Sequence, residues 1–355
     1  MYYSIMGLSS SKPFENEFYI EERESLHGFE YVYPGDGLLY GIDSSLNEMY
    51  DLMLIYVFGD TASYYDLVMN LPMICDEAGY SPEAQISSDN MNTAIQRMGK
   101  NSILGREMLL ADLQFLIGSI NNLVSALSFD FINFYMYLSK IDFPKDHFEE
   151  NTIFTSGHRC GVVFSSLTSY FTKAYSILDI TTKLAYEFEH DPGSYKGLTK
   201  LRSKDVLFGS KKGLSLYKVP GTIFEVSDKS CISIIESLRN ELVHNGTWDL
   251  FPKIYCEFDG DNPRRKYIYW PDFSQGHLAC SINRKRYFSS AYTTNEALVA
   301  IHLEFLNRLS FTIDCMLIKY KKHLPKRSFE EATGFSVNDS KEQIINYYNA
   351  IRKEG

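Results

Sequence analysis

Three polar residues with defined chemistry stand close together in the segment SIIESLRNELVHNG, residues 233–246. Arg239, Asn240 and His244 form the pattern R-N-x-x-x-H. A histidine with an ordinary pKa of about 6.5 can take up or release a proton near neutral pH. An arginine fork stays charged and matches the oxygens of a phosphate group. The three residues therefore offer proton transfer and anion binding; the alternative is an ordinary solvated helix face.

The segment around these residues has the spacing of an amphipathic helix, which we expect over about 226–245. At about 100° per residue, its large apolar side chains fall on one stripe, which we expect to be buried. That stripe consists of Ile234, Ile235, Leu238 and Leu242. Asn245-Gly246 is a suitable helix end, because glycine tolerates the left-handed backbone of a C-terminal cap.

The polar residues fall on the other side of the same helix. Ser233, Glu236, Asn240 and His244 point away from the apolar stripe, and Asn240 and His244 are one turn apart. Arg239 lies on the flank, and its side chain is long enough to reach the polar face. We therefore expect the three residues to face solvent or a second protein surface.

Other long helices must hold this segment in place. We expect them at 44–70, at 90–138 as one or two helices, at 158–190 and at 293–320. Asp43 or Ser44 is a suitable first cap, and Thr293 or Thr294 starts the last helix with Glu296 nearby.

Two regions have the residue pattern of β-strands. Residues 1–40 predict short strands and turns, and the alternation at about 251–290 predicts one or two β-hairpins. The segment between about 140 and 157 is expected to be a break between helices. The expected fold is mainly α, with an N-terminal α+β extension and a small β-hairpin insertion after the motif helix. We expect three regions: a mostly helical region of unassigned role at 1–150, a helical domain at 151–325 and a helical tail at 326–355.

The charge of the chain is unevenly distributed. The net charge is −10, but residues 1–160 hold 8 Lys and Arg against 23 Asp and Glu, a net charge of −15. Residues 251–327 hold 13 against 7, a net charge of +6. An acidic protein is not a general nucleic-acid binder, but the basic segment leaves room for a local phosphate-binding surface.

The sequence composition also indicates which cofactors and which cellular location to expect. The six cysteines have no CxxC or Cys/His spacing, so we expect reduced thiols, no metal site and no cofactor. The apolar run near 103–138 is interrupted by polar residues, so we expect no membrane span. The N-terminus lacks the pattern of a signal peptide, and we expect a cytoplasmic protein.

The motif resembles one known family. Arg239-Asn240-x-x-x-His244 looks like the RNxxxH form of the Rx4–6H motif of the HEPN superfamily, small helical bundles found in ribonuclease toxins and antiviral defence proteins. The preceding helix, with YFTKAYSILDITTKLAYE, also resembles HEPN helices, in which an acidic residue such as Asp179 can sit in an apolar face. The resemblance covers roughly 155–320. The β insertion and the acidic N-terminal region depart from the family pattern.

The resemblance implies an activity and an assembly. HEPN proteins often dimerise, so that two motif helices form one composite site. The implied function is a metal-independent endoribonuclease, a toxin or antiphage (abortive-infection) effector, that cleaves RNA by attack of the 2′-OH. Two copies of His244 would supply the acid and the base, Arg239 would stabilise the phosphorane, and Asn240 would orient His244 or contact phosphate. Asp179 and Glu236 would be supporting residues.

The basic segment is a candidate RNA-binding surface. Its cations are Arg264, Arg265, Lys266, Arg284, Lys285 and Arg286. Tyr267, Tyr269, Trp270 and Tyr287 could stack on bases, although aromatic alternation in hairpins is more often core packing. Two rival functions remain open: a non-catalytic HEPN-like protein for dimerisation or partner binding, and a toxin held inactive by an antitoxin or another defence-system partner.

Overall fold

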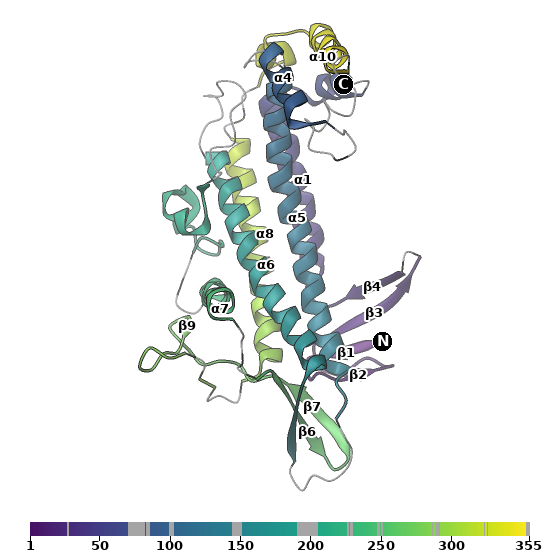
Figure 1. Ribbon diagram of the computed structural model, residues 1–355, viewed down its shortest axis with the longest axis vertical. Helices are drawn as coiled ribbons and strands as arrows, with labels where there is room; N and C mark the ends of the chain where they lie inside the picture. Colours follow the sequence, from purple (N-terminus) through teal and green to yellow (C-terminus); the bar gives the residue numbers. More distant parts are fainter. Residues whose placement is uncertain are drawn as a thin grey trace. The chain divides into compact units, whose positions relative to one another are not determined.

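The fold is known from a computed structural model, which is 62% helical and 15% strand, so the prediction of a mainly α protein is confirmed. The structure describes residues 1–26, 28–69, 82, 86–98, 103–143, 151–189, 205–225, 227, 230–246, 249, 251–285, 287–288, 292–322, 324 and 326–352. Within these residues all sheets are small and antiparallel. The ribbon is drawn in Figure 1.

The strands form three sheets. The first has the order β2-β1-β3-β4, built from Ser9–Ser10, Tyr2–Ser4, Tyr19–Ser25 and Gly28–Val32. The second has the order β5-β6-β7, built from Thr152–Ser156, Lys253–Asp259 and Asn262–Tyr267. The third pairs β8, Phe273–Ser274, with β9, His277–Leu278.

The helices follow in chain order. They are α1 (Gly37–Phe58), α2 (Thr61–Val68), α4 (Ser88–Met98), α5 (Ile103–Ser139), α6 (His158–Glu189), η4 (Phe208–Gly213), η5 (Ser215–Lys218), α7 (Cys231–Asn245), α8 (Thr294–Lys321), α9 (Phe329–Thr333) and α10 (Val337–Arg352). The predicted helices at 158–190 and 293–320 are confirmed, and the one at 90–138 is two helices, α4 and α5. The cap of α8 is also confirmed, because the Thr293 hydroxyl bonds to the Glu296 carboxylate.

The helix expected at 44–70 is wrong in two respects. It begins earlier, at Gly37, and it is broken between α1 and α2. Gly59 has a φ of +85°, in the region that favours glycine, and a Cβ there would lie 2.4 Å from the Ser328 carbonyl oxygen. Asp60 then caps α2, accepting hydrogen bonds from the N–H groups of Ala62 and Ser63.

The chain folds into two compact units that are each discontinuous in sequence. The first comprises 1–42, 122–178 and 218–312; the second comprises 43–121, 179–217 and 313–355. This division differs from the expected regions 1–150, 151–325 and 326–355, because helices α1, α5, α6 and α8 each contribute residues to both units.

The first unit contains the N-terminal sheet as an integral part. The Lys266 N–H donates to the Met6 carbonyl oxygen, and the Asn295 amide donates to the Ile5 and Lys266 carbonyls. Gly7, with a φ of +67°, permits this approach, because a Cβ there would lie 2.6 Å from the Lys266 carbonyl oxygen. The N-terminal strands are therefore not a separate extension.

The core of the first unit holds a buried polar group that the sequence did not reveal. The ring of His302, on α8, stacks on Phe131 with centroids 4.1 Å apart. The Tyr33 hydroxyl lies 3.0 Å from Nε2 of His302, and the Tyr170 hydroxyl lies 3.2 Å from Nδ1. Burial lowers the pKa of His302 to about 3, so the ring is neutral at pH 7.

The second unit has its own aromatic core. Phe58 packs against Tyr64 with ring centroids 4.7 Å apart and stacks on Phe329 at 6.0 Å. The Lys341 ammonium, on α10, lies 2.9 Å from the Asp66 carboxylate of α2. Helices α1, α2, α9 and α10 are thus connected within this unit.

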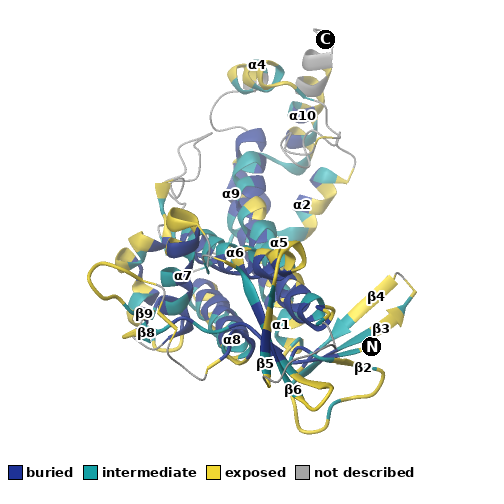
Figure 2. Ribbon diagram, turned by 60° about the horizontal axis from the view of Figure 1, so that its bottom comes forward, coloured by how far each residue is buried: buried dark blue, intermediate teal, exposed yellow. Residues whose placement is uncertain are grey.

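The strand β5 was not expected. Residues 152–156 lie in the segment predicted to be a break, yet they pair along β6 from Thr152–Glu257 to Ser156–Lys253. The β-hairpins predicted at 251–290 are present as β6–β7 (Figure 1) and as β8–β9 (Figure 2). The β6–β7 hairpin of the insertion is therefore part of a three-stranded sheet that also includes the strand before α6.

Candidate functional site

The motif helix, α7, lies in the first unit and has defined ends. Ser230 caps it by accepting a hydrogen bond from the Ser233 N–H, and Gly246 follows its last residue with a φ of +89°. Ile235, Leu238 and Leu242 are buried as expected. Ile234 is only half-buried and Ser233 is buried, the reverse of the prediction. The Ser233 hydroxyl donates to the Ser227 carbonyl oxygen, which compensates its burial.

Arg239 has two side-chain partners in the first unit. Its guanidinium lies 4.5 Å from the centroid of the Tyr175 ring of α6, a cation–π contact. One of its N–H groups donates to Oδ1 of Asn240 over 3.0 Å. Because a guanidinium has five N–H donors, this arrangement keeps donors for an anion while restricting the side chain.

Asn240 and His244 are both exposed on the same face of α7, one helical turn apart. Within the described part of the chain, no hydrogen bond or ion pair reaches the His244 ring. The structure thus brings Arg239 and Asn240 into contact and leaves His244 beside them at the surface. A cation, an amide and an imidazole on one exposed face can bind a phosphate group and exchange protons with it.

The supporting residues are placed differently. Glu236 is half-buried on α7. Asp179 accepts a hydrogen bond from the Phe208 N–H over 2.7 Å, which fixes η4 against α6. This contact is structural, and the supporting catalytic role expected for Asp179 stays a prediction.

The three consecutive cations on β7 have different environments. Arg264 is exposed. Arg265 pairs with Glu257 over 2.6 Å, and this hydrogen bond lowers the pKa of the Glu257 carboxyl. Lys266 is buried; its ammonium donates to the Ser139 carbonyl oxygen, and burial lowers its pKa. Lys266 therefore cannot reach an RNA strand as expected, because strand alternation turns it toward the core.

The second basic cluster lies before α8. Arg284 and Lys285 are exposed, and the Lys285 ammonium lies 3.8 Å from the Glu241 carboxylate of α7. Arg286, the last of the expected cations, lies outside the described residues.

The insertion also supports the motif helix, which sequence reasoning missed. The Leu278 N–H of β9 donates to the Ser237 hydroxyl of α7 over 3.0 Å. Glu241 is buried beside the motif and accepts a hydrogen bond from the Asn245 amide. The i,i+4 spacing of Glu241 and Asn245 was the available signal for this second contact.

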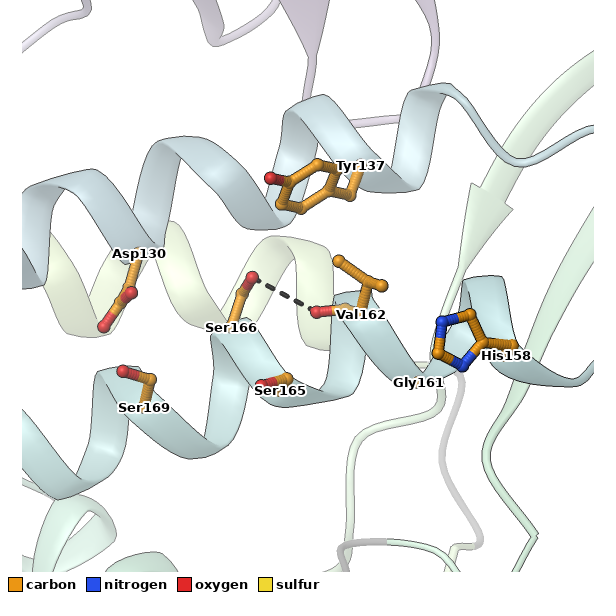
Figure 3. Close-up of a pocket in the computed structure, with 8 residues that line it drawn as sticks. All are labelled: Asp130, Tyr137, His158, Gly161, Val162, Ser165, Ser166 and Ser169. Carbon is orange, nitrogen blue, oxygen red and sulfur yellow. Dashed lines mark hydrogen bonds between the residues drawn. The ribbon is translucent and has the colours of Figure 1, made fainter.

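A pocket of 580 Å³ lies elsewhere in the first unit, between α5 and α6. Its lining is rich in small and hydroxyl-bearing side chains: Asp130, Tyr137, His158, Gly161, Val162, Ser165, Ser166 and Ser169 (Figure 3). The Ser166 hydroxyl donates to the Val162 carbonyl oxygen, and Asp130 pairs with Lys173 over 2.6 Å. The motif residues are not among those that line it.

No three His, Cys, Asp or Glu side chains within the described ranges form a group that could hold a metal ion. One described helix, α5, is long and apolar enough to cross a membrane by length and composition, and half of its most apolar window is buried inside the protein. Core helices of soluble proteins have the same property, so this finding does not by itself indicate a membrane protein.

The chain was compared with family models, with curated proteins and with solved structures. No family model, curated protein or solved structure matches the chain.

Proposed function

We propose that this chain is a metal-independent endoribonuclease of the HEPN type, which acts as a homodimer in a cytoplasmic toxin or antiphage defence system. The observation that carries the proposal is the exposed face of α7. Arg239 is oriented by Tyr175 and Asn240, and His244 lies one turn away from Asn240 without a hydrogen-bond partner among the described residues. Core packing does not account for these three side chains.

The proposed reaction uses only these groups. One His244 accepts the proton of the attacking 2′-OH, and His244 of a second copy donates a proton to the leaving 5′-oxygen. Arg239 neutralises the charge on the phosphorane through its planar fork. Asn240 holds Arg239 through its carbonyl oxygen, which leaves its amide nitrogen to donate to phosphate or to His244. The products are a 2′,3′-cyclic phosphate and a free 5′-hydroxyl.

The test compares purified wild type with Arg239→Ala and His244→Ala on labelled RNA in the presence of a chelator. We expect cleavage by wild type and a loss of about 100-fold or more in each variant. His158→Ala is the matched control, because His158 is also an exposed histidine of the first unit. An inactive wild type, or two variants as active as wild type, would overturn the proposal.

A second function is supported by a different observation. Among the described residues of the insertion, Lys266 is buried, and Arg265 and Lys285 lie beside carboxylates, in a chain of net charge −10. This favours a non-catalytic role, in which the same face of α7 binds a second copy or a defence-system partner such as an antitoxin. Wild type that dimerises through α7 but leaves RNA intact would identify this role.

A further inference from the structure

The β5–β6–β7 sheet carries a row of aromatic rings across its three strands. Strand register places Phe154 opposite Tyr255 and Tyr255 opposite Tyr267. The ring centroids are 6.0 Å apart in the first pair and 5.7 Å apart in the second, where the rings are stacked. Tyr269 adds a fourth ring, 4.6 Å from Tyr255. We call this row, with the cations beside it, the aromatic face.

The aromatic face is the outer side of the sheet. Alternate residues of the same strands, Ile153, Ile254 and Cys256, are buried on the inner side. Figure 2 shows buried and exposed segments along β5 and β6. Phe154 remains 58% exposed and Tyr255 is half-buried, whereas Tyr267 is covered. Cross-strand packing explains the pairing of Tyr255 with Tyr267, but it does not explain a phenylalanine left in water at the end of the row.

Cations lie at both ends of the row. The Lys253 ammonium is 5.3 Å from the centroid of Phe154, and the Arg265 guanidinium is 4.8 Å from the centroid of Tyr267. Arg265 also neutralises Glu257, the acidic residue on this face of β6. Because Arg265 is already paired with Glu257, Lys253 is the cation of this row that can meet a phosphate. An exposed ring beside such a cation suits one kind of ligand, in which unpaired bases stack on the rings while a phosphate meets Lys253. A duplex would hide the base faces, and an apolar protein surface would leave Lys253 without an anion.

We infer that the aromatic face binds unpaired bases of single-stranded RNA, with Phe154 and Tyr255 as the stacking positions. The inference rests on the proposed function in naming RNA as the strand; the stacking surface itself rests on the geometry of the sheet. It gives β5 and the β6–β7 hairpin after the motif helix a role in holding substrate.

The test measures binding separately from cleavage. The full chain with His244→Ala is titrated against a labelled 12-nucleotide oligouridine, and fluorescence polarisation gives the Kd. We expect Phe154→Ala to weaken binding roughly 5- to 100-fold, the range for loss of one base–aromatic stack. Phe129→Ala is the matched control, because Phe129 is a phenylalanine of the first unit with similar exposure, 54%, on α5. It should leave the Kd unchanged.

Three further variants distinguish base stacking from nonspecific hydrophobic or electrostatic binding. Phe154→Trp should keep or improve the affinity, whereas Phe154→Leu should weaken it, because leucine has no flat face for a base. Lys253→Gln should reduce the salt dependence of binding by about 0.7 in the log–log slope, as expected for one phosphate contact on a single strand. A duplex of the same length should bind more weakly than the single strand.

Several results would overturn the inference. The first is a Phe154→Ala variant that binds RNA as tightly as Phe129→Ala, and the second is equal affinity of the Phe154→Leu and Phe154→Trp variants. The third is a duplex that binds as tightly as the single strand. The fourth is a change of oligomeric state in Phe154→Ala, which would make the aromatic face a contact between copies of the chain. Failure of the nuclease proposal is distinguishable: wild type would not cut RNA while Phe154→Ala still weakened its binding.

Discussion

Acidification should destabilise the first unit through one buried histidine. His302 has a pKa of about 3 in the folded protein because burial penalises its charged form, against an ordinary value of 6.5. Its ring is enclosed by Phe131, Tyr33 and Tyr170, and no carboxylate of the described residues forms a hydrogen bond or ion pair with it. Protonation would give both ring nitrogens an N–H, so the tyrosine hydroxyl that donates to the ring would have to turn away.

The magnitude follows from linkage. Between pH 6.5 and pH 3 the unfolded chain binds a proton at His302 and the folded chain does not, so stability rises with pH in this window. The contribution is fully present above about pH 6.5 and is lost as the pH falls toward 3. Each pKa unit is about 1.4 kcal/mol, so the free energy of unfolding should fall by about 2 kcal/mol at pH 5 and by roughly 3 kcal/mol at pH 4.

The assay compares wild type with His302→Gln by urea unfolding, followed by circular dichroism, from pH 7.5 to pH 4. Glutamine keeps one donor and one acceptor for the two tyrosines but has no proton to gain in this range. We expect the variant to be less stable at pH 7.5, since the stack on Phe131 is lost. On acidification its free energy of unfolding should fall less than that of wild type, by about 2 kcal/mol at pH 5 and roughly 3 kcal/mol at pH 4. Parallel curves for the two proteins, or an NMR titration of His302 with a midpoint above pH 6, would refute the reasoning.

Three other perturbations have defined outcomes. Adding excess His244→Ala to wild type should lower the cleavage rate per wild-type protomer as heterodimers form, because a composite site then has one histidine; an unchanged rate would mean that each protomer acts alone. Tyr175→Leu should lower kcat by roughly 2- to 30-fold through loss of the cation–π contact with Arg239, while Tyr175→Phe should retain it. Lys173→Met leaves the buried Asp130 carboxylate without its partner and should cost about 1–3 kcal/mol in thermal or urea unfolding, whereas Arg159→Met, at an exposed pair with Asp142, should cost under about 0.5 kcal/mol.

The local sequence pattern was sufficient to predict the long helices. It was insufficient where contacts with residues distant in the sequence determine the secondary structure. The apolar spacing of 158–190 predicted α6 nearly to the residue, because a helix that buries one stripe carries its signal in its own sequence. β5 was missed, because its five residues become a strand only by pairing with β6, about a hundred residues further along the chain. The break at Gly59 was missed for a similar reason: the carbonyl of Ser328 that approaches it is remote in sequence.

The site was predictable in part. The helical wheel placed Asn240 and His244 at the surface, as observed. It misplaced Ser233, because an N-terminal turn can bury a hydroxyl that bonds to nearby carbonyl groups. The run Arg264-Arg265-Lys266 looked like one basic patch, but a strand alternates its side chains between two faces. Register with β6 therefore put Lys266 in the core opposite Cys256 and Arg265 on the outer face opposite Glu257.

The buried side and the exposed side of α7 differ in what a mutation there can show. Leu238 and Glu241 are buried on either side of the motif pair Arg239-Asn240, and Ser237 is bonded to β9. A substitution at any of these three positions removes packing or a hydrogen bond that positions the helix, so loss of activity there would not identify a catalytic group. Asn240 and His244 are exposed, and the printed interactions of Arg239 are with Asn240 and Tyr175, so truncation of these side chains should disturb the packing of α7 less. Loss of cleavage with unchanged stability at those positions would therefore be assignable to chemistry.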